Sequence, residues 1–151
     1  MRIFFLFFLL IFISLNLGAE MIKPDPSISP KEVISIQLKA LQNNNVPFEN
    51  AGIVQTWEFA HPDNRLATGP LQNFTLMILK SFTVMINHKS HKIKLLKKND
   101  ILSFYIIEIE DKNSNQYQFQ WVVQKVEKNE KFKNCWMTVN VSMPIFLNKA
   151  A

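Results

Sequence analysis

The sequence predicts an α+β domain with N-terminal helices packed on a curved antiparallel sheet. Apolar residues recur at helical spacing up to Lys80, whereas from Phe82 onward they recur at alternate positions. The strand patterns follow one another along the chain and are separated by short turns. Helices first and consecutive strands afterward are typical of an α+β domain whose helices cover one face of the sheet.

Residues 1–19 are predicted to lie outside this domain as a cleaved signal peptide. Arg2 precedes an apolar run of residues 3–13, and small residues follow up to Ala19, as in a secretory signal. The alternative is a membrane anchor formed by residues 3–17, although the run is shorter than the roughly 20 residues that a spanning helix needs. We therefore expect an exported protein, periplasmic or secreted, that meets a membrane only if this segment is retained.

The rest of the chain is predicted to hold a linker, residues 20–28, and one folded domain, residues 29–147. Removing Arg2 reduces the 17 basic residues to 16 against 12 acidic ones, which leaves a net charge of +4. The lysines are dispersed among acids, so the one-sided basic face of a nucleic-acid binder is not predicted. Cys135 is the only cysteine; it excludes an internal disulfide and is expected to be a small buried hydrophobe.

Two helices are predicted near the start of the domain. The first begins at Pro30, a residue that suits the first helical position, and ends at a run of three asparagines. Ser29 and Glu32 form the capping-box pattern in front of it. The second helix is predicted over residues 51–59, with Asn50 as its N-cap.

The pattern after the second helix predicts a turn, a third helix and then strands. Pro62 forces the preceding residue out of helical geometry, so residues 61–64 are predicted to form a tight turn. The third helix is expected from a Thr68 cap to about Lys80, with Pro70 early in it. The predicted strands cover residues 82–87, 93–97, 101–110, 116–126 and 135–143.

The segment between Pro47 and Phe74 is the predicted place for a functional site. His61, Asp63 and Arg65 occupy alternate positions in it. In a functional interpretation, Arg65 binds a carboxylate or phosphate, and His61 or Asp63 moves a proton. In the structural alternative, Arg65 bonds the carbonyls at a helix end, Asp63 satisfies turn amides, and His61 stacks beside the next proline.

Trp57, Trp121 and Trp136 are the other candidates for ligand contact. Aromatic residues line apolar small-molecule pockets, but a domain of this size also needs them in its core. A mixed arrangement would place the tryptophans at the floor of a pocket and His61 or Arg65 at its rim.

No metal or cofactor is predicted. His88 and His91 form a His-x-x-His pair, but no cysteine or acidic cluster accompanies them and lysines lie beside them. Protein zinc sites use three or four ligands, so the pair is expected in a solvated strand connection. The sequence also lacks the P-loop, GxGxxG and GxSxG motifs.

A family resemblance is carried by six blocks of the sequence: Pro47–Ile53, Trp57–Arg65, Thr68–Leu71, Phe74, Gln120–Trp121 and Asn134–Thr138. Together these blocks resemble DUF4864, a known family whose function is unknown. The resemblance covers roughly residues 29–143 and implies an NTF2-like, or cystatin-like, fold, in which a bent sheet wraps a long helix into a hollow cone. It implies no catalytic residues, because the family has no established activity.

We therefore expect a non-catalytic exported domain that binds a small apolar ligand or a protein partner in its cone. The alternative is a small isomerase- or dehydratase-type enzyme that uses Asp63 or His61 as a base in the cone. A third interpretation is a homodimer formed through the open face of the sheet, which would cover the glutamines at positions 116, 118, 120 and 124.

Overall fold

The computed structural model describes residues 20–149 and confirms the α+β class. The predicted signal peptide or anchor, residues 1–19, lies outside the described residues. Within residues 20–149, no helix combines the length and apolarity that crossing a membrane requires. The elements are α1 Pro30–Gln42, α2 Ala51–Glu58, α3 Pro62–Thr68, α4 Leu71–Ser81, β1 Ser90–Lys98, β2 Leu102–Glu110, β3 Asn115–Lys125, β4 Trp136–Val141 and β5 Ile145–Lys149.

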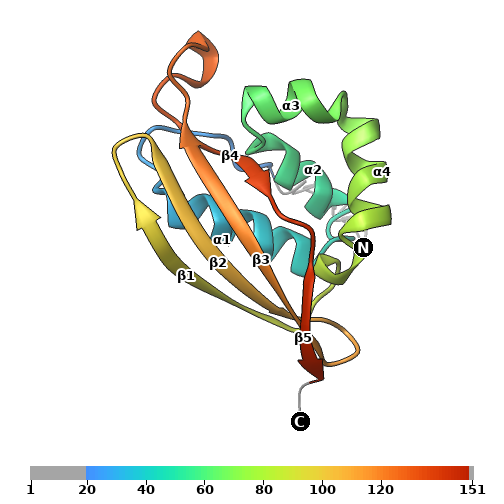
Figure 1. The fold of residues 1–151 in the computed structure, drawn as a ribbon. Coiled ribbons are helices and arrows are strands. Elements are labelled where there is room, and N and C mark those ends of the chain that lie inside the picture. Colours follow the sequence, from blue (N-terminus) through green and yellow to red (C-terminus); the bar gives the residue numbers. More distant parts are fainter. Residues whose placement is uncertain (1–19, 150–151) are drawn as a thin grey trace, which may run out of the picture.

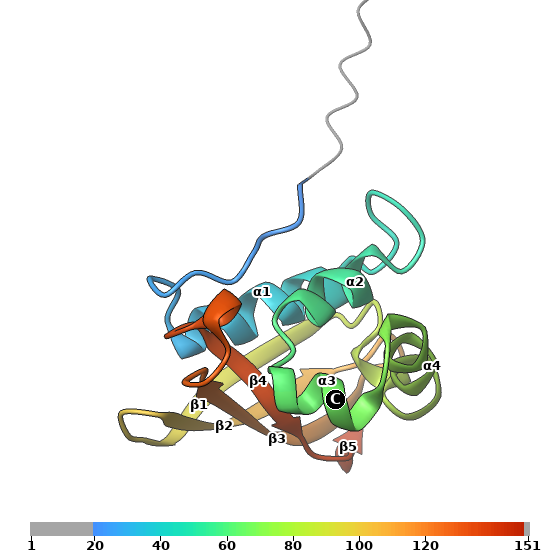
Figure 2. The ribbon, with the colours of Figure 1, turned by 90° about the horizontal axis from the view of Figure 1, so that it is seen from above.

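α1 crosses one face of a five-stranded antiparallel sheet, while α2, α3 and α4 gather on the β4 side (Figures 1 and 2). The strands follow the order β1-β2-β3-β4, and β5 pairs with β3. The sheet is neither closed nor strongly curled. The cone that the family resemblance implies therefore stays a prediction.

α1 begins with the predicted capping box. The Ser29 hydroxyl accepts a hydrogen bond from the Glu32 N–H, and the Glu32 carboxylate accepts one from the Ser29 N–H. The buried stripe of α1 consists of Val33, Ile34, Gln37, Leu38 and Leu41. Gln37 is the polar member of that stripe and is only 1% exposed.

α2 starts where predicted and Asn50 occupies its N-cap position, but the side chain of Asn44, not that of Asn50, accepts a hydrogen bond from the first turn. Asn50 has a positive φ of 61°, and its side chain makes no capping bond. The Asn44 Oδ1 accepts the Ile53 N–H at 3.1 Å, and the Asn44 Nδ2 donates to the Asn50 Oδ1 at 3.0 Å. The run of asparagines therefore forms a buried corner between α1 and α2 in addition to ending α1.

The predicted tight turn at residues 61–64 is wrong, because Pro62 begins a helix. His61 has the extended backbone that a residue before proline requires, with φ −54° and ψ 145°. Pro62 then occupies the first helical position, where its missing N–H costs no hydrogen bond. As a consequence Thr68 ends α3 instead of capping the next helix, and Pro70 is the N-cap of α4.

The predicted strand at residues 82–87 is also wrong. Thr83–Met85 form a 3₁₀ turn, and Asn87 has a positive φ of 53°. Phe82 and Met85 are both buried in the core; a helical turn brings residues at this spacing to one side, whereas a strand does not. β1 begins at Ser90, before the predicted residue 93.

β3 is the central strand and confirms the predicted alternation. Phe119, Trp121 and Val123 are buried, whereas the glutamines on the other face are half-buried or exposed. β4 pairs with the C-terminal half of β3, and β5 pairs with its N-terminal half. The single strand predicted over residues 135–143 is therefore wrong at its end, because the chain leaves β4 after Val141 and continues as β5.

Candidate functional site

A pocket of about 320 Å³ lies between α3, α4 and β4, with its floor on α1, α2 and β3. The volume is at the lower end of the range of small-molecule sites. Asp63 is the only charged residue among the described residues that line it. The apolar part of the wall is formed by Ala60, Ala67, Phe74, Met77, Ile78, Phe82, Met85, Val139 and Val141.

A chain of buried hydrogen bonds forms the polar floor of the pocket. The Trp121 indole N–H donates to the Thr138 Oγ1 at 2.9 Å, and the Thr138 hydroxyl donates to the Gln37 Oε1 at 2.6 Å. The Gln37 Nε2 in turn donates to the main-chain oxygen of Thr56 at 3.0 Å. Four elements, α1, α2, β3 and β4, are thus connected at this floor, which fixes the position of each side chain.

The main chain of Thr138 holds the helices against the edge of the sheet. Its N–H donates to the Phe59 oxygen, and its oxygen accepts from the His61 N–H, both at 2.8 Å. The Asn64 Nδ2 donates to the same Thr138 oxygen at 3.2 Å. The link between α2 and α3 therefore behaves as a short extra strand beside β4, and this contact places α3 at the mouth of the pocket.

Two of the six predicted site residues line this pocket, Trp121 and Asp63. Trp121 is buried in the floor, whereas the Asp63 side chain is 69% exposed. Trp57 does not line the pocket but packs behind its wall, with its ring 5.0 Å from that of Phe74. Trp136 lies outside the pocket as well, and the Lys125 ammonium is 5.1 Å from its ring centre.

Arg65 bonds the carbonyls at a helix end, which is the structural alternative to ligand binding. Its guanidinium donates to the main-chain oxygens of Trp57, Glu58 and Ala60 at 2.9 to 3.0 Å. It also lies over the rings of Trp57 and Phe132. Arg65 does not line the pocket.

His61 is buried beside the pocket and acts as the N-cap of α3. Its Nδ1 accepts the Asp63 N–H at 3.1 Å, so the neutral ring carries its proton on Nε2. That Nε2 is buried and has no hydrogen-bond partner among the described residues. Burial lowers the pKa of His61, and the Asp63 carboxylate opposes this effect. The ring lines a second, polar pocket together with Asp63 and the loop after β3.

No sequence motif identifies Gln37 and Thr138, two polar residues of the floor, as site residues. The sequence signal for Gln37 is its position in the apolar stripe of the first helix, where a polar residue needs a buried partner. Thr138 carries no comparable signal, because a threonine is common in any strand.

His88 and His91 are bonded to each other, with His88 buried and His91 half-buried, rather than lying in a solvated connection. The His88 Nδ1 lies 2.7 Å from the Met85 oxygen, and the His88 Nε2 lies 2.7 Å from the His91 Nδ1. Burial lowers the pKa of both rings. Across residues 20–149, no three His, Cys, Asp or Glu side chains gather as a metal site.

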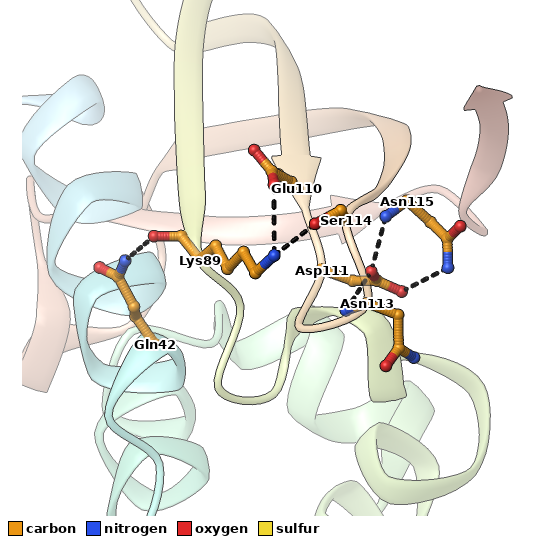
Figure 3. Close-up of polar contacts among 7 residues, drawn as sticks. All are labelled: Gln42, Lys89, Glu110, Asp111, Asn113, Ser114 and Asn115. Atoms are coloured by element: carbon orange, nitrogen blue, oxygen red, sulfur yellow. Dashed lines mark hydrogen bonds and ion pairs between the residues drawn. The ribbon is translucent and has the colours of Figure 1, made fainter. Parts of the chain in front are cut away.

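A polar cluster connects α1, the residue that precedes β1, the end of β2 and the β2–β3 loop (Figure 3). The Gln42 Nε2 donates to the Lys89 oxygen at 2.7 Å, and the Lys89 ammonium contacts the Ser114 hydroxyl and lies 3.7 Å from the Glu110 carboxylate. Asp111 closes the loop by accepting hydrogen bonds from the two asparagines that follow it, as Figure 3 shows. The charged groups of this cluster are thus paired within the protein, and we assign it a structural role.

The chain matches no protein-family model, no curated protein and no solved structure at a significant level. The assignment of the pocket therefore rests on its geometry and chemistry.

Proposed function

We propose that this protein is an exported, non-catalytic NTF2-like domain that binds a small apolar molecule in the pocket between α4 and β4. The proposal rests on one observation: an apolar wall surrounds a polar floor whose hydrogen bonds fix its side chains. Small-molecule sites combine mostly apolar walls with a few fixed polar groups in this way. The order of helices and strands and the long α1 across the sheet support the NTF2-like assignment.

The size of the pocket supports a small ligand over a protein segment. A volume of about 320 Å³ is near the minimum of the range that small-molecule sites span. A single aromatic ring with one or two substituents matches this space, whereas a folded partner would need a much larger contact area.

The contacts of the candidate groups favour binding over proton transfer. An isomerase- or dehydratase-type enzyme needs a base and a hydrogen-bond donor that face the same enclosed space. The donors of Arg65 are bound to helix carbonyls, and the Trp121 N–H is bound to Thr138. Asp63 is at the exposed mouth, and His61 lies outside the pocket wall.

The test is a titration of the ¹⁵N-labelled domain with 4-ethylphenol, followed through the indole N–H resonance of Trp121. We expect a saturable shift in the wild type and its loss in Ala67→Trp, because Ala67 lines the pocket and a bulky side chain there occupies it. Leu66→Trp is the matched control, since Leu66 is the neighbouring residue of α3, is 84% exposed and does not line the pocket. Equal shifts in both variants, or none in the wild type, would contradict the proposal.

We separately propose that two copies associate through the face of the sheet that points away from α1. Phe104, Ile106 and Val122 lie half-buried on this face among the glutamines of β3. Sedimentation velocity tests the idea, because a monomer at all accessible concentrations would exclude it.

A further inference from the structure

All three threonine hydroxyls in the pocket wall already donate their hydrogen to the protein. The Thr138 hydroxyl donates to Gln37, as described above. The Thr56 hydroxyl donates to the Gly52 oxygen at 2.8 Å, and the Thr68 hydroxyl donates to the Asn64 oxygen at 2.9 Å. A hydroxyl has one hydrogen and two lone pairs, so each of these oxygens faces a ligand only as an acceptor.

The direction of the hydrogen bonds at Thr138 is fixed by its partners. An indole N–H only donates, and a main-chain oxygen only accepts. Trp121 must therefore donate to Thr138, and Gln37 must turn its amino group to the Thr56 oxygen and its Oε1 to Thr138. The hydroxyl hydrogen is thus used in the bond to the Gln37 Oε1, and a ligand could recruit it only by breaking that bond.

The charge of the pocket wall disfavours an anionic ligand, as its hydrogen-bond acceptors do. Asp63 is the only charged residue among the described lining residues, and no lysine, arginine or histidine lines the pocket with it. His61, whose Nδ1 is 3.6 Å from the Asp63 carboxylate, lies outside the wall. The remaining side-chain donors are the amide hydrogens of Gln37, Asn64 and Asn140, of which the first two already make one hydrogen bond each. Nothing in the wall compensates the charge of a buried anion, which costs several kcal/mol in a low-dielectric site.

We infer that the ligand is an uncharged alcohol or phenol whose hydroxyl hydrogen bonds an oxygen of the pocket wall, and that carboxylates and phosphates are rejected. This inference rests on the proposed function and names the ligand class of the same site. It reverses the expectation that Arg65 binds a carboxylate or phosphate. That guanidinium already donates to main-chain oxygens at the C-terminal end of α2 and directly after it.

The test compares three molecules on one skeleton by isothermal titration calorimetry: 4-ethylphenol, its methyl ether and 4-ethylbenzoate. The ether keeps the ring but loses the donor, and we expect it to bind about fivefold more weakly than the phenol. The benzoate is expected to bind at least about tenfold more weakly, because its charge must be desolvated without a cationic partner.

A variant that removes only the charge of Asp63 tests whether this carboxylate contributes to the rejection of anions. Asp63→Asn should raise the affinity for 4-ethylbenzoate by about threefold, since an exposed charge contributes little. Asp100→Asn, which removes an equal charge in the β1–β2 turn, should leave that affinity unchanged. If the ether or the benzoate binds as tightly as the phenol in the wild type, the inferred ligand class is wrong although the pocket is real. If none of the three binds, the proposed function itself is overturned.

Discussion

Arg65 contacts both the main chain and the ring of Trp57. Its Nη2 is 2.9 Å from the main-chain oxygen of Trp57, and its guanidinium carbon lies 4.9 Å from the centre of the Trp57 ring. Both residues therefore belong to the junction of α2 and α3. The planar fork of an arginine suits this position, because one side chain bonds several carbonyls and stacks on a ring at the same time.

The first prediction concerns this junction. Arg65→Lys should lower the free energy of unfolding by about 2 kcal/mol, because an ammonium cannot serve the three carbonyl groups and the ring together. Urea denaturation measures the change, with Lys112→Ala as a control that should remain near wild type, because Lys112 is exposed in the β2–β3 loop. A variant as stable as the wild type would show that the guanidinium contacts are dispensable.

The second prediction concerns Asn44, which is 1% exposed and bonds α2 through both ends of its amide. Asn44→Ala should cost about 2 kcal/mol, because the buried Ile53 N–H loses its acceptor. Asn44→Asp keeps an acceptor for Ile53, but it loses the donor to the Asn50 Oδ1 and buries a charge, so it should destabilise the domain as well. Hydrogen exchange at the Ile53 amide provides a local measurement, and unchanged protection in the alanine variant would contradict the capping role.

The third prediction concerns the crossing of α1 and α2 at Gly52. A Cβ added there would lie 2.2 Å from the Ala40 oxygen and 2.9 Å from the Asn44 Cα. Since both atoms belong to the main chain, Gly52→Ala should separate the helices and cost about 3 kcal/mol. A melting temperature equal to that of the wild type would show that the helices can separate freely.

The fourth prediction concerns pH. A carbonyl oxygen only accepts, so the His88 Nδ1 donates to Met85, and in the neutral pair the His91 Nδ1 donates to the His88 Nε2. The pair retains this bond with one added proton, on the His91 Nε2, but a second proton on the His88 Nε2 would face an N–H group. Two charged rings are therefore incompatible with the native contact.

Burial lowers the folded-state pKa of both rings below the usual 6.5, and for His91 the neighbouring His88 and Lys39 add to the effect. The neutral forms stabilise the fold above pH 6.5, and this contribution should be lost as the pH falls through the lowered values. Denaturation at a series of pH values measures the loss. His91→Asn keeps a donor toward His88 but removes one titrating group. It should therefore reduce the slope of the free energy of unfolding against pH, and an unchanged slope would contradict the role of the histidine pair.

The helix and strand assignments from sequence were correct where one face alone is buried. The capping box of α1 and the alternation along β3 are local patterns, and the structure confirms both. Besides the end of the strand predicted over residues 135–143, the errors fall at His61 and Phe82, where the same residues are compatible with two backbone conformations. Pro62 is suited to a turn and to the start of a helix alike, and contact with Thr138 selects the helix.

The candidate site could be located only in part. Trp121 and Asp63 were identified because large aromatic and charged residues stand out in a sequence, whereas Thr138 does not. Arg65 was assigned two roles, and the choice between them depends on which carbonyl groups lie within its reach.

The α+β order, the helix cap at Ser29 and the inward face of β3 can be read from the amino-acid sequence, because each depends on residues only a few positions apart. The meeting of Gln37, Trp121 and Thr138 at one floor, and the position of Arg65 away from it, follow from the packing of the elements against one another. These relationships join α1, β3 and β4, and no periodicity within a single segment encodes the distance between side chains of different segments.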